Sequence, residues 1–182
     1  MDQQEKPSLY SHAMRWGVIL ALATIFLTVI IYVLDYTVLV QFKLLLLFLV
    51  LFLGILIYAG INYRSSIGGY ISYGDAFKHG FVLLVISGLI GTVFNVLLYN
   101  VIDPDLPAKL TDAAMENARQ MMERFGAPPD GMDEALEKAK ADTAARFTIL
   151  GTVKGFLWGL ILYAVVVAIT SLFVRKNEPI EM

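Results

Sequence analysis

Four long apolar runs constrain this chain more than any other feature, and they cover Trp16–Leu34, Leu44–Ile61, Phe77–Val101 and Phe147–Val174. Each run holds at least about 18 residues, enough for an α-helix with a rise of about 1.5 Å per residue to cross a hydrocarbon core about 30 Å thick. Apolar residues lie on all sides of each run, as in helices that face lipid or one another. The sequence therefore predicts four membrane-spanning helices, at about residues 14–34, 43–63, 76–101 and 147–174.

The composition excludes several classes of protein. The chain is 58% hydrophobic and 16% charged, whereas a soluble domain carries about 25% charged residues. Its net charge of −2 provides no basic field for nucleic acid, so we expect the lipid bilayer as a partner and no nucleic acid. The absence of cysteine excludes disulfides, thiol catalysis and cysteine-ligated metals.

The distribution of basic residues predicts the orientation. They gather before the first helix, around the second loop and after the fourth helix, namely Lys6, Arg15, Arg64, Lys78, Arg175 and Lys176. By the positive-inside rule, both termini and the loop Asn62–His79 are cytoplasmic. The acidic segment Asp103–Arg146 then lies on the other side. We expect a multi-pass protein of the bacterial inner (cytoplasmic) membrane.

The start of the third helix carries the most distinctive loop. Ser72 and Asp75 fit a capping box, in which Ser72 Oγ accepts from the N–H of residue 75 and Asp75 reaches back to the N–H of Ser72. The predicted cytoplasmic interface motif is Tyr70, Ser72, Asp75, Lys78 and His79. Asp75 and His79 are four residues apart on one helix face, which predicts an interfacial ion pair; a proton-relay pair is the alternative.

Small residues recur at helical spacing in two of the helices. One stripe contains Ser87, Gly91 and Asn95, and the other contains Gly151, Gly155 and Gly159. Such stripes let helix backbones approach closely in lipid. The first interpretation is tight packing of the third helix on the fourth. The alternatives are a homodimer through the glycine stripe and a cofactor site there.

Two polar residues lie inside the apolar runs, Asn95 and Lys154. A lysine at the bilayer centre costs about 2.5–3.5 kcal/mol. The fourth run is longer than a span requires, so Lys154 is expected at the outer interface. The alternative pairs Lys154 with Asp35 or Asp103, which end their own helices on the same side. Asn95 is expected to form a helix–helix hydrogen bond rather than to bind a ligand.

The segment Asp103–Arg146 reads as two short amphipathic helices. Their apolar stripes are Leu110, Ala114, Ala118, Met121 and Phe125, then Met132, Leu136, Ala139 and Thr143. Gly126, Pro128 and Pro129 end the first helix. The second begins near Asp130 and runs toward Phe147, either ending there or continuing into the fourth spanning helix. A self-packed hairpin is the favoured interpretation, and a methionine-rich partner-binding surface is the alternative.

These patterns together predict the fold class. It is all-α: a single membrane domain, residues 1–182, with a four-helix bundle and a short amphipathic helical hairpin at 103–146 between the third and fourth spanning helices. No phosphate-binding glycine loop, dinucleotide fingerprint, zinc-protease motif or nucleophile elbow occurs. The acidic residues at 130–137 lack the spacing of a calcium loop. We therefore expect no enzyme, no catalytic residues, no cofactor and no metal site.

One family resemblance spans nearly the whole chain, from about Met14 to Lys176. It is carried by the four helices, the motif Gly68-Gly-Tyr-Ile-Ser-Tyr-Gly-Asp-Ala-Phe-Lys78, the Asp103-Pro-Asp105 exit and the insert rich in Met and Glu. In these features the chain resembles the bacterial membrane family Domain of Unknown Function 4199, typical of Bacteroidota. The resemblance implies a small inner-membrane protein and assigns no activity and no functional residues.

Two functional hypotheses follow. The leading one is a non-enzymatic structural or accessory protein that acts through helix–helix association, as a homodimer or within a larger membrane complex. The rival is a small dimeric transporter or channel with a polar path near Asn95 and Lys154. A third, a membrane-stress or lipid sensor through Tyr70–His79, rests on position alone.

Overall fold

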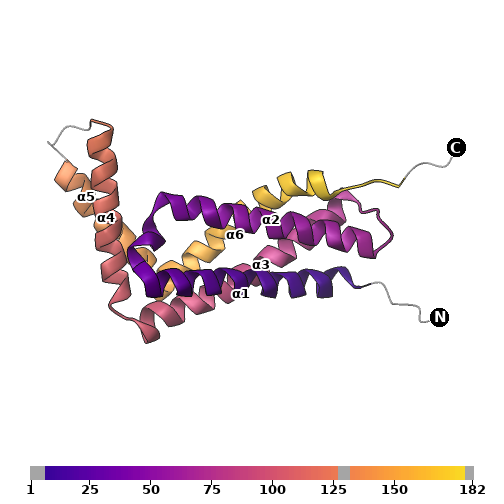
Figure 1. Cartoon of the computed structure of the whole chain (residues 1–182), viewed down its shortest axis with the longest axis horizontal. Coiled ribbons are helices and arrows are strands. Elements are labelled where there is room, and N and C mark those ends of the chain that lie inside the picture. Colours follow the sequence, from indigo (N-terminus) through magenta and orange to yellow (C-terminus); the bar gives the residue numbers. More distant parts are fainter. Residues whose placement is uncertain (1–6, 127–131, 179–182) are drawn as a thin grey trace. The chain divides into compact units, whose positions relative to one another are not determined.

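The computed structural model describes residues 7–126 and 132–178, and these ranges are built of α-helices (Figure 1). The long apolar helices are α1 (Leu9–Asp35), α2 (Phe42–Ser66), α3 (Tyr73–Leu97) and α6 (Ile149–Val174). A 3₁₀ turn, η1 (Tyr36–Val40), extends α1, and a π-helical turn, η2 (Leu98–Ile102), extends α3. All four helices are long and apolar enough to cross a membrane. The prediction of a multi-pass, all-helical membrane protein is confirmed.

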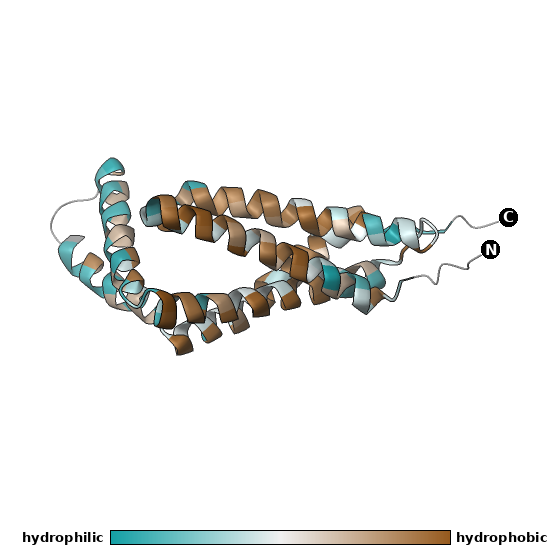
Figure 2. Ribbon diagram, turned by 60° about the horizontal axis from the view of Figure 1, so that its bottom comes forward, coloured by the Kyte–Doolittle hydropathy of each residue, from teal (hydrophilic) through white to brown (hydrophobic). Residues whose placement is uncertain are grey.

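Two shorter helices, α4 (Leu106–Arg124) and α5 (Met132–Arg146), lie between α3 and α6 in the sequence. In Figure 2 most of the ribbon of these two helices is coloured hydrophilic, whereas the four long helices are coloured mostly hydrophobic. Pro107 occupies the first turn of α4, where its missing N–H costs no hydrogen bond. Gly126, with a φ of 71°, ends the helix in the left-handed conformation. The predicted turn residues Pro128, Pro129 and Asp130 lie outside the described residues.

Between α5 and α6 the helix is interrupted, so α5 does not continue into the fourth spanning helix. Thr148 makes the break: its hydroxyl donates to the carbonyl of Ala145 and accepts from the N–H of Gly151 at 3.0 Å. A Cβ atom on Gly151 would collide with the backbone of Ala145 and Arg146. This tight turn therefore requires a glycine at position 151. The glycine spacing had instead predicted that Gly151 packs one helix against another.

The chain divides into two compact units. Unit 1 contains Met1–Thr24, Phe48–Gly91 and Leu157–Met182, and unit 2 contains Ile25–Leu47 and Thr92–Phe156. Each long helix therefore contributes one end to unit 1 and the other to unit 2. The α2–α3 loop belongs to unit 1, whereas η1, η2, α4 and α5 belong to unit 2.

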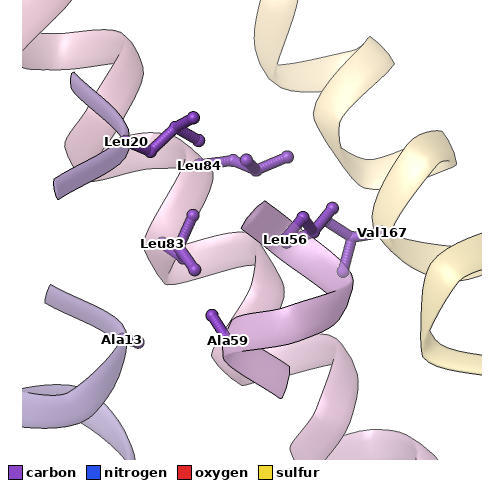
Figure 3. Close-up of a cluster of buried hydrophobic side chains, with 7 residues drawn as sticks. All are labelled: Ala13, Leu20, Leu56, Ala59, Leu83, Leu84 and Val167. Carbon is purple, nitrogen blue, oxygen red and sulfur yellow. The ribbon is translucent and has the colours of Figure 1, made fainter. Parts of the chain in front are cut away.

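The core of unit 1 joins all four long helices. Figure 3 shows its seven fully enclosed side chains, Ala13, Leu20, Leu56, Ala59, Leu83, Leu84 and Val167. A second cluster follows toward the chain termini, with Tyr63, Ile71, Ala76 and Val174 buried together. The apolar side chains on the other faces of the helices are exposed, as expected where lipid takes the place of water.

Three glycines allow the helices of unit 1 to approach closely. A Cβ atom on Gly17 would lie 2.7 Å from the carbonyl oxygen of Leu83, so α1 and α3 touch at backbone level. A Cβ on Gly60 would lie 2.8 Å from Val174, and one on Gly80 would lie 3.0 Å from Val167. These glycines place α2 and α3 directly against α6.

The core of unit 2 is smaller and holds α4 in place. Leu98, Leu106 and Leu110 are buried there, surrounded by the partly buried side chains Tyr32, Leu39, Val40, Phe94, Tyr99 and Phe147. The first half of α4 is thereby fixed against η1 and the end of α3. Two ion pairs join α4 to α5, Arg119 with Asp133 at 2.9 Å and Lys140 with Asp112 at 2.7 Å.

Candidate functional site

The two histidines of the chain meet inside unit 1. His12 lies in the first turn of α1 and His79 in the second turn of α3. His12 Nδ1 lies 2.9 Å from His79 Nε2, and His12 Nε2 lies 3.0 Å from Oδ1 of Asn62 on α2. One polar chain, Asn62–His12–His79, therefore connects three spanning helices. We call these three residues the histidine clasp.

Aromatic rings enclose the clasp. Tyr63 stacks on His79 with ring centroids 4.9 Å apart and an interplanar angle of 10°, and its ring lies 5.1 Å from that of His12. Trp16 lies one turn further along α1, 6.3 Å from the His12 ring. His79 is only 1% exposed. The His12–His79 hydrogen bond is thus partly buried among aromatic rings, where its loss is expensive, whereas Asn62 is exposed.

Hydrogen bonding fixes how many protons the clasp holds. The Asn62 oxygen only accepts, so His12 Nε2 must carry a proton. Between the two rings one nitrogen donates and the other accepts, which is possible when both rings are neutral or when one is a cation. If both rings were cations, two N–H groups would face each other across 2.9 Å. The closed clasp can therefore hold at most one proton more than two neutral rings carry.

The carboxylate nearest to His79 along α3 is engaged elsewhere. Asp75 accepts from Lys78 Nζ at 3.1 Å and from the hydroxyl of Ser72 at 2.9 Å. The predicted Asp75–His79 ion pair and proton relay are therefore wrong, because each residue has another partner. The capping box is half correct: the N–H of Asp75 donates to Ser72 Oγ at 3.1 Å, but the Asp75 carboxylate accepts from that hydroxyl rather than from the Ser72 N–H.

The loop before α3 is tied to the segment that follows α6. Ile71 and Lys176 exchange two backbone hydrogen bonds, of 2.9 and 3.1 Å. Lys176 also lies over the ring of Tyr70, 5.4 Å from its centroid, and the Tyr73 hydroxyl donates to the carbonyl of Ala168. Tyr73 therefore contacts the C-terminal half of α6, and Tyr70, a residue of the predicted interface motif, contacts the segment that follows α6.

The residues predicted to pack helices are not brought together. Ser87 is buried, but a Cβ atom on Gly91 or Gly155 would meet nothing within 4 Å. A Cβ on Gly159 would meet only Tyr163 of its own helix. The close approach expected at these positions occurs instead at Gly17, Gly60 and Gly80.

The predicted polar path is also dispersed. Asn95 is half-buried and Lys154 is exposed. Both acidic partners considered for Lys154 are engaged by other groups. Asp35 caps η1 by accepting from the N–H and hydroxyl of Thr37, and Asp103 accepts from the Tyr32 hydroxyl at 3.0 Å and from Lys109 Nζ at 3.5 Å.

Asp103 links the end of α3 to the start of α4. Desolvation alone would raise the pKa of its carboxyl, but the hydrogen bonds from Tyr32 and Lys109, together with the charge of Lys109, outweigh it and hold the pKa below its ordinary value. The ionised form is therefore the one that the fold of unit 2 stabilises.

Sequence reasoning identified His79 but missed His12 and Asn62. The signal that would have found them is small-residue spacing on α1, where Ala13, Gly17 and Ala21 recur every four residues. That stripe marks the face of α1 that packs inward, and His12 lies beside it. The sequence analysis considered small-residue stripes only on the third and fourth spanning helices, so the stripe on α1 was not used.

Metal binding has little support in this arrangement. Among residues 7–126 and 132–178, no three His, Asp or Glu side chains come close enough together to hold a metal ion. The second nitrogen of His12 is already hydrogen-bonded to Asn62.

Comparison with known proteins gives one match. The model of a family described as "Protein of unknown function (DUF4199)" matches residues 15–176, which include α1 from residue 15 onward, the other three spanning helices and the insert. No curated protein and no solved structure matches the chain.

Proposed function

The chain belongs to the DUF4199 family of proteins of unknown function, and we propose that it is a non-enzymatic accessory protein of the bacterial inner membrane that acts by helix–helix association. The open glycines of α6 carry this proposal. Gly17, Gly60 and Gly80 are filled by neighbouring helices, whereas Gly155 and Gly159, four residues apart, meet no other helix within the described residues. A G-x-x-x-G surface left free in this way fits a helix from a second copy or from another membrane protein.

Matched glycine variants test association. Gly155→Leu fills the proposed contact surface, and Gly54→Leu adds the same side chain at an isolated glycine of α2 that also has no neighbour within 4 Å. The tagged protein is purified from its own host in mild detergent, and native mass spectrometry gives the mass of the complex. We expect Gly155→Leu to lose the larger species and Gly54→Leu to keep it. Equal behaviour of the two variants would refute the assigned surface.

The proposed orientation places both termini and the α2–α3 loop in the cytoplasm. The basic residues at that end, including Arg64 and Lys176, support it. Because the chain has no cysteine, single cysteines at Ser66 and Glu134 can be labelled with an impermeant thiol reagent in intact spheroplasts. We expect labelling at position 134 only, and labelling at position 66 would reverse the orientation.

We also propose that α4 and α5 form a self-packed amphipathic hairpin on the periplasmic side. The ion pairs Arg119–Asp133 and Asp112–Lys140 support an antiparallel arrangement of the two helices. Asp112 lies seven residues before Arg119 on α4, whereas Lys140 lies seven residues after Asp133 on α5. Leu136 is buried on the expected stripe of α5. On α4 the stripe ends early, since Met121 and Phe125 are exposed.

The histidine clasp makes the accessory role sensitive to protons. The closed clasp excludes the second proton, so falling pH favours the open form. Arg15 on α1 is exposed, Asp75 on α3 is paired with Lys78, and α2 contributes the neutral Asn62 and Tyr63. Among the residues named here, all within the described part of the chain, no free carboxylate compensates a doubly charged pair.

A proton-coupled transporter is the second candidate function, and the clasp favours it over the path near Asn95 and Lys154. Ionisable side chains such as histidine within spanning helices mark proton relays in pumps and transporters, and the clasp brings two of them together. Its test is proton flux into liposomes measured with an internal pH dye. Loss of flux in His79→Gln, with the assembly unchanged, would favour transport, and wild-type flux no faster than that of empty liposomes would exclude it.

A further inference from the structure

A groove in unit 2 lies where α1 ends and α2 begins. It has a volume of about 480 Å³ and is bounded by the turn at residues 41–43 and by the C-terminal half of α4. Val40 ends one candidate span and Phe42 begins the next, so the turn between them lies at the depth of the lipid headgroups. Leu106 and Leu110, in the N-terminal half of α4, are buried and fix this helix against η1. The groove thus occupies the membrane surface.

The polar lining of the groove is selective for anions. Lys43 and Arg124 contribute two positive charges, and the carboxamides of Gln41 and Asn117 contribute N–H donors, whereas Gln120 Nε2 already donates to Glu116 at 2.9 Å. No carboxylate lines this groove among the described residues. Neither Lys43 nor Arg124 belongs to any of the ion pairs that the described residues form. A guanidinium, an ammonium and two amides form a donor set suited to a phosphate group.

The apolar lining is equally specific. Phe42 is 63% exposed, Met121 51% and Phe125 84%, and all three line the same groove. Exposed to water, these side chains would form a costly patch, but beside the bilayer they can contact acyl chains. The groove therefore presents donors for a phosphate next to a surface for hydrocarbon.

We propose that this groove binds an anionic phospholipid, with its phosphate held by Lys43 and Arg124 and its acyl chains against Phe42, Met121 and Phe125. The juxtaposition of both linings at headgroup depth favours a lipid over a free phosphate or a peptide. The site is independent of the histidine clasp and of the glycine surface of α6, and it gives the insert a defined contact with the membrane.

Lipid retention on the purified full chain tests the proposal. The protein is exchanged into detergent with equimolar phosphatidylglycerol and phosphatidylcholine, and native mass spectrometry counts the lipids that remain bound. The double variant Lys43→Gln/Arg124→Gln removes the phosphate donors from exposed positions, so the fold should be retained. Lys138→Gln/Arg146→Gln removes the same two charges from exposed positions of α5 and is the control.

We expect the wild type and the control to prefer phosphatidylglycerol, and the groove variant to lose about tenfold or more of that preference. Phe125→Ser should weaken retention of both lipids while keeping the preference. Equal retention of the two lipids by the wild type would overturn the proposal. An unchanged preference in the groove variant, or an equal loss in the control, would overturn the assignment to this groove. Displacement of the lipid by millimolar glycerol phosphate would show that the site recognises free phosphate esters instead.

Discussion

The two units solve the problem of packing helices in lipid differently. Unit 1 uses close helix contacts at Gly17, Gly60 and Gly80, together with the partly buried histidine clasp. Unit 2 uses large apolar side chains around Leu106 and Leu110, with Asp103 and the exposed ion pairs of α4 and α5 outside them. The comparison shows that one end of a set of spanning helices can pack through close contacts at glycines, while the other end packs through large apolar side chains. We therefore expect added volume at its close-packed glycines to destabilise unit 1, and truncation of a buried leucine to destabilise unit 2.

The largest effect is expected from truncation in the core of unit 2. Leu110→Ala removes a side chain that is 1% exposed and leaves a cavity, which costs about 2–5 kcal/mol of unfolding free energy. Hydrogen exchange should rise in α4 and η1 and stay low in α3 beside Leu83. The control is Leu45→Ala, because Leu45 is 59% exposed and truncation there leaves no cavity. Equal loosening of both units would contradict two separate cores.

Added volume should break unit 1. Gly17→Leu pushes a side chain into the carbonyl of Leu83 and the Ile86 side chain, so α1 must move away from α3. We expect about 1–3 kcal/mol of destabilisation in SDS titration of the detergent-solubilised protein. Gly54→Leu, which meets open space, should unfold like the wild type. If both variants unfold alike, the close approach of α1 and α3 is not a stabilising contact.

Protonation of Asp103 should weakly destabilise unit 2 at acidic pH. Its pKa lies below the ordinary value in the folded state, so its contribution is present above the unfolded pKa of about 4 and is lost as the pH falls through the folded value. Asp103→Asn should remove this dependence and loosen the first turns of α4 at neutral pH. Chymotryptic cleavage near Leu106 at several pH values measures it, with Asp105→Asn as the control. A loss of protection in the control as large as that in Asp103→Asn would count against the Tyr32–Asp103 bond.

The smallest effect is expected from the ion pairs that join α4 and α5. Arg119 and Asp133 are 48% and 87% exposed, so Arg119→Gln should cost only about 0.2–1 kcal/mol. The loss should shrink further in high salt, where surface charges are screened. Thermal unfolding at low and high ionic strength provides the comparison. A large, salt-independent loss would show that the pair is buried by something beyond this chain.

The sequence predicted the helices correctly but did not predict which residues of different helices are in contact. Hydropathy located the four spanning helices to within a few residues, because length and composition alone decide whether a helix can cross lipid. The insert helices followed from Pro107 and Gly126. The sequence left open whether the second insert helix ends near Phe147, because a hydroxyl cap at Thr148 inside an otherwise helical stretch gives no periodic signal.

The prediction of the site was wrong for a related reason. Spacing along one helix predicted that Asp75 would pair with His79, but the partner of His79 is His12, 67 residues away. Pairing across helices depends on which faces meet, and that was set by the Ala13–Gly17–Ala21 stripe rather than by the glycines of α6. A local pattern indicates which residues can interact and does not indicate which helix supplies the partner.

The most direct test of the clasp is the distance between α1 and α3 as the pH falls. Spin labels at Tyr10→Cys and Gly74→Cys, in this cysteine-free chain, report that distance by pulsed electron resonance in nanodiscs. We predict one narrow distribution at pH 7.5 and a second, longer component once the pH lies well below the ~6.5 of a free imidazole. His79→Gln, which cannot become a second cation, should show no pH dependence. A wild-type distance that does not change with pH, or an equal change in His79→Gln, would contradict the account.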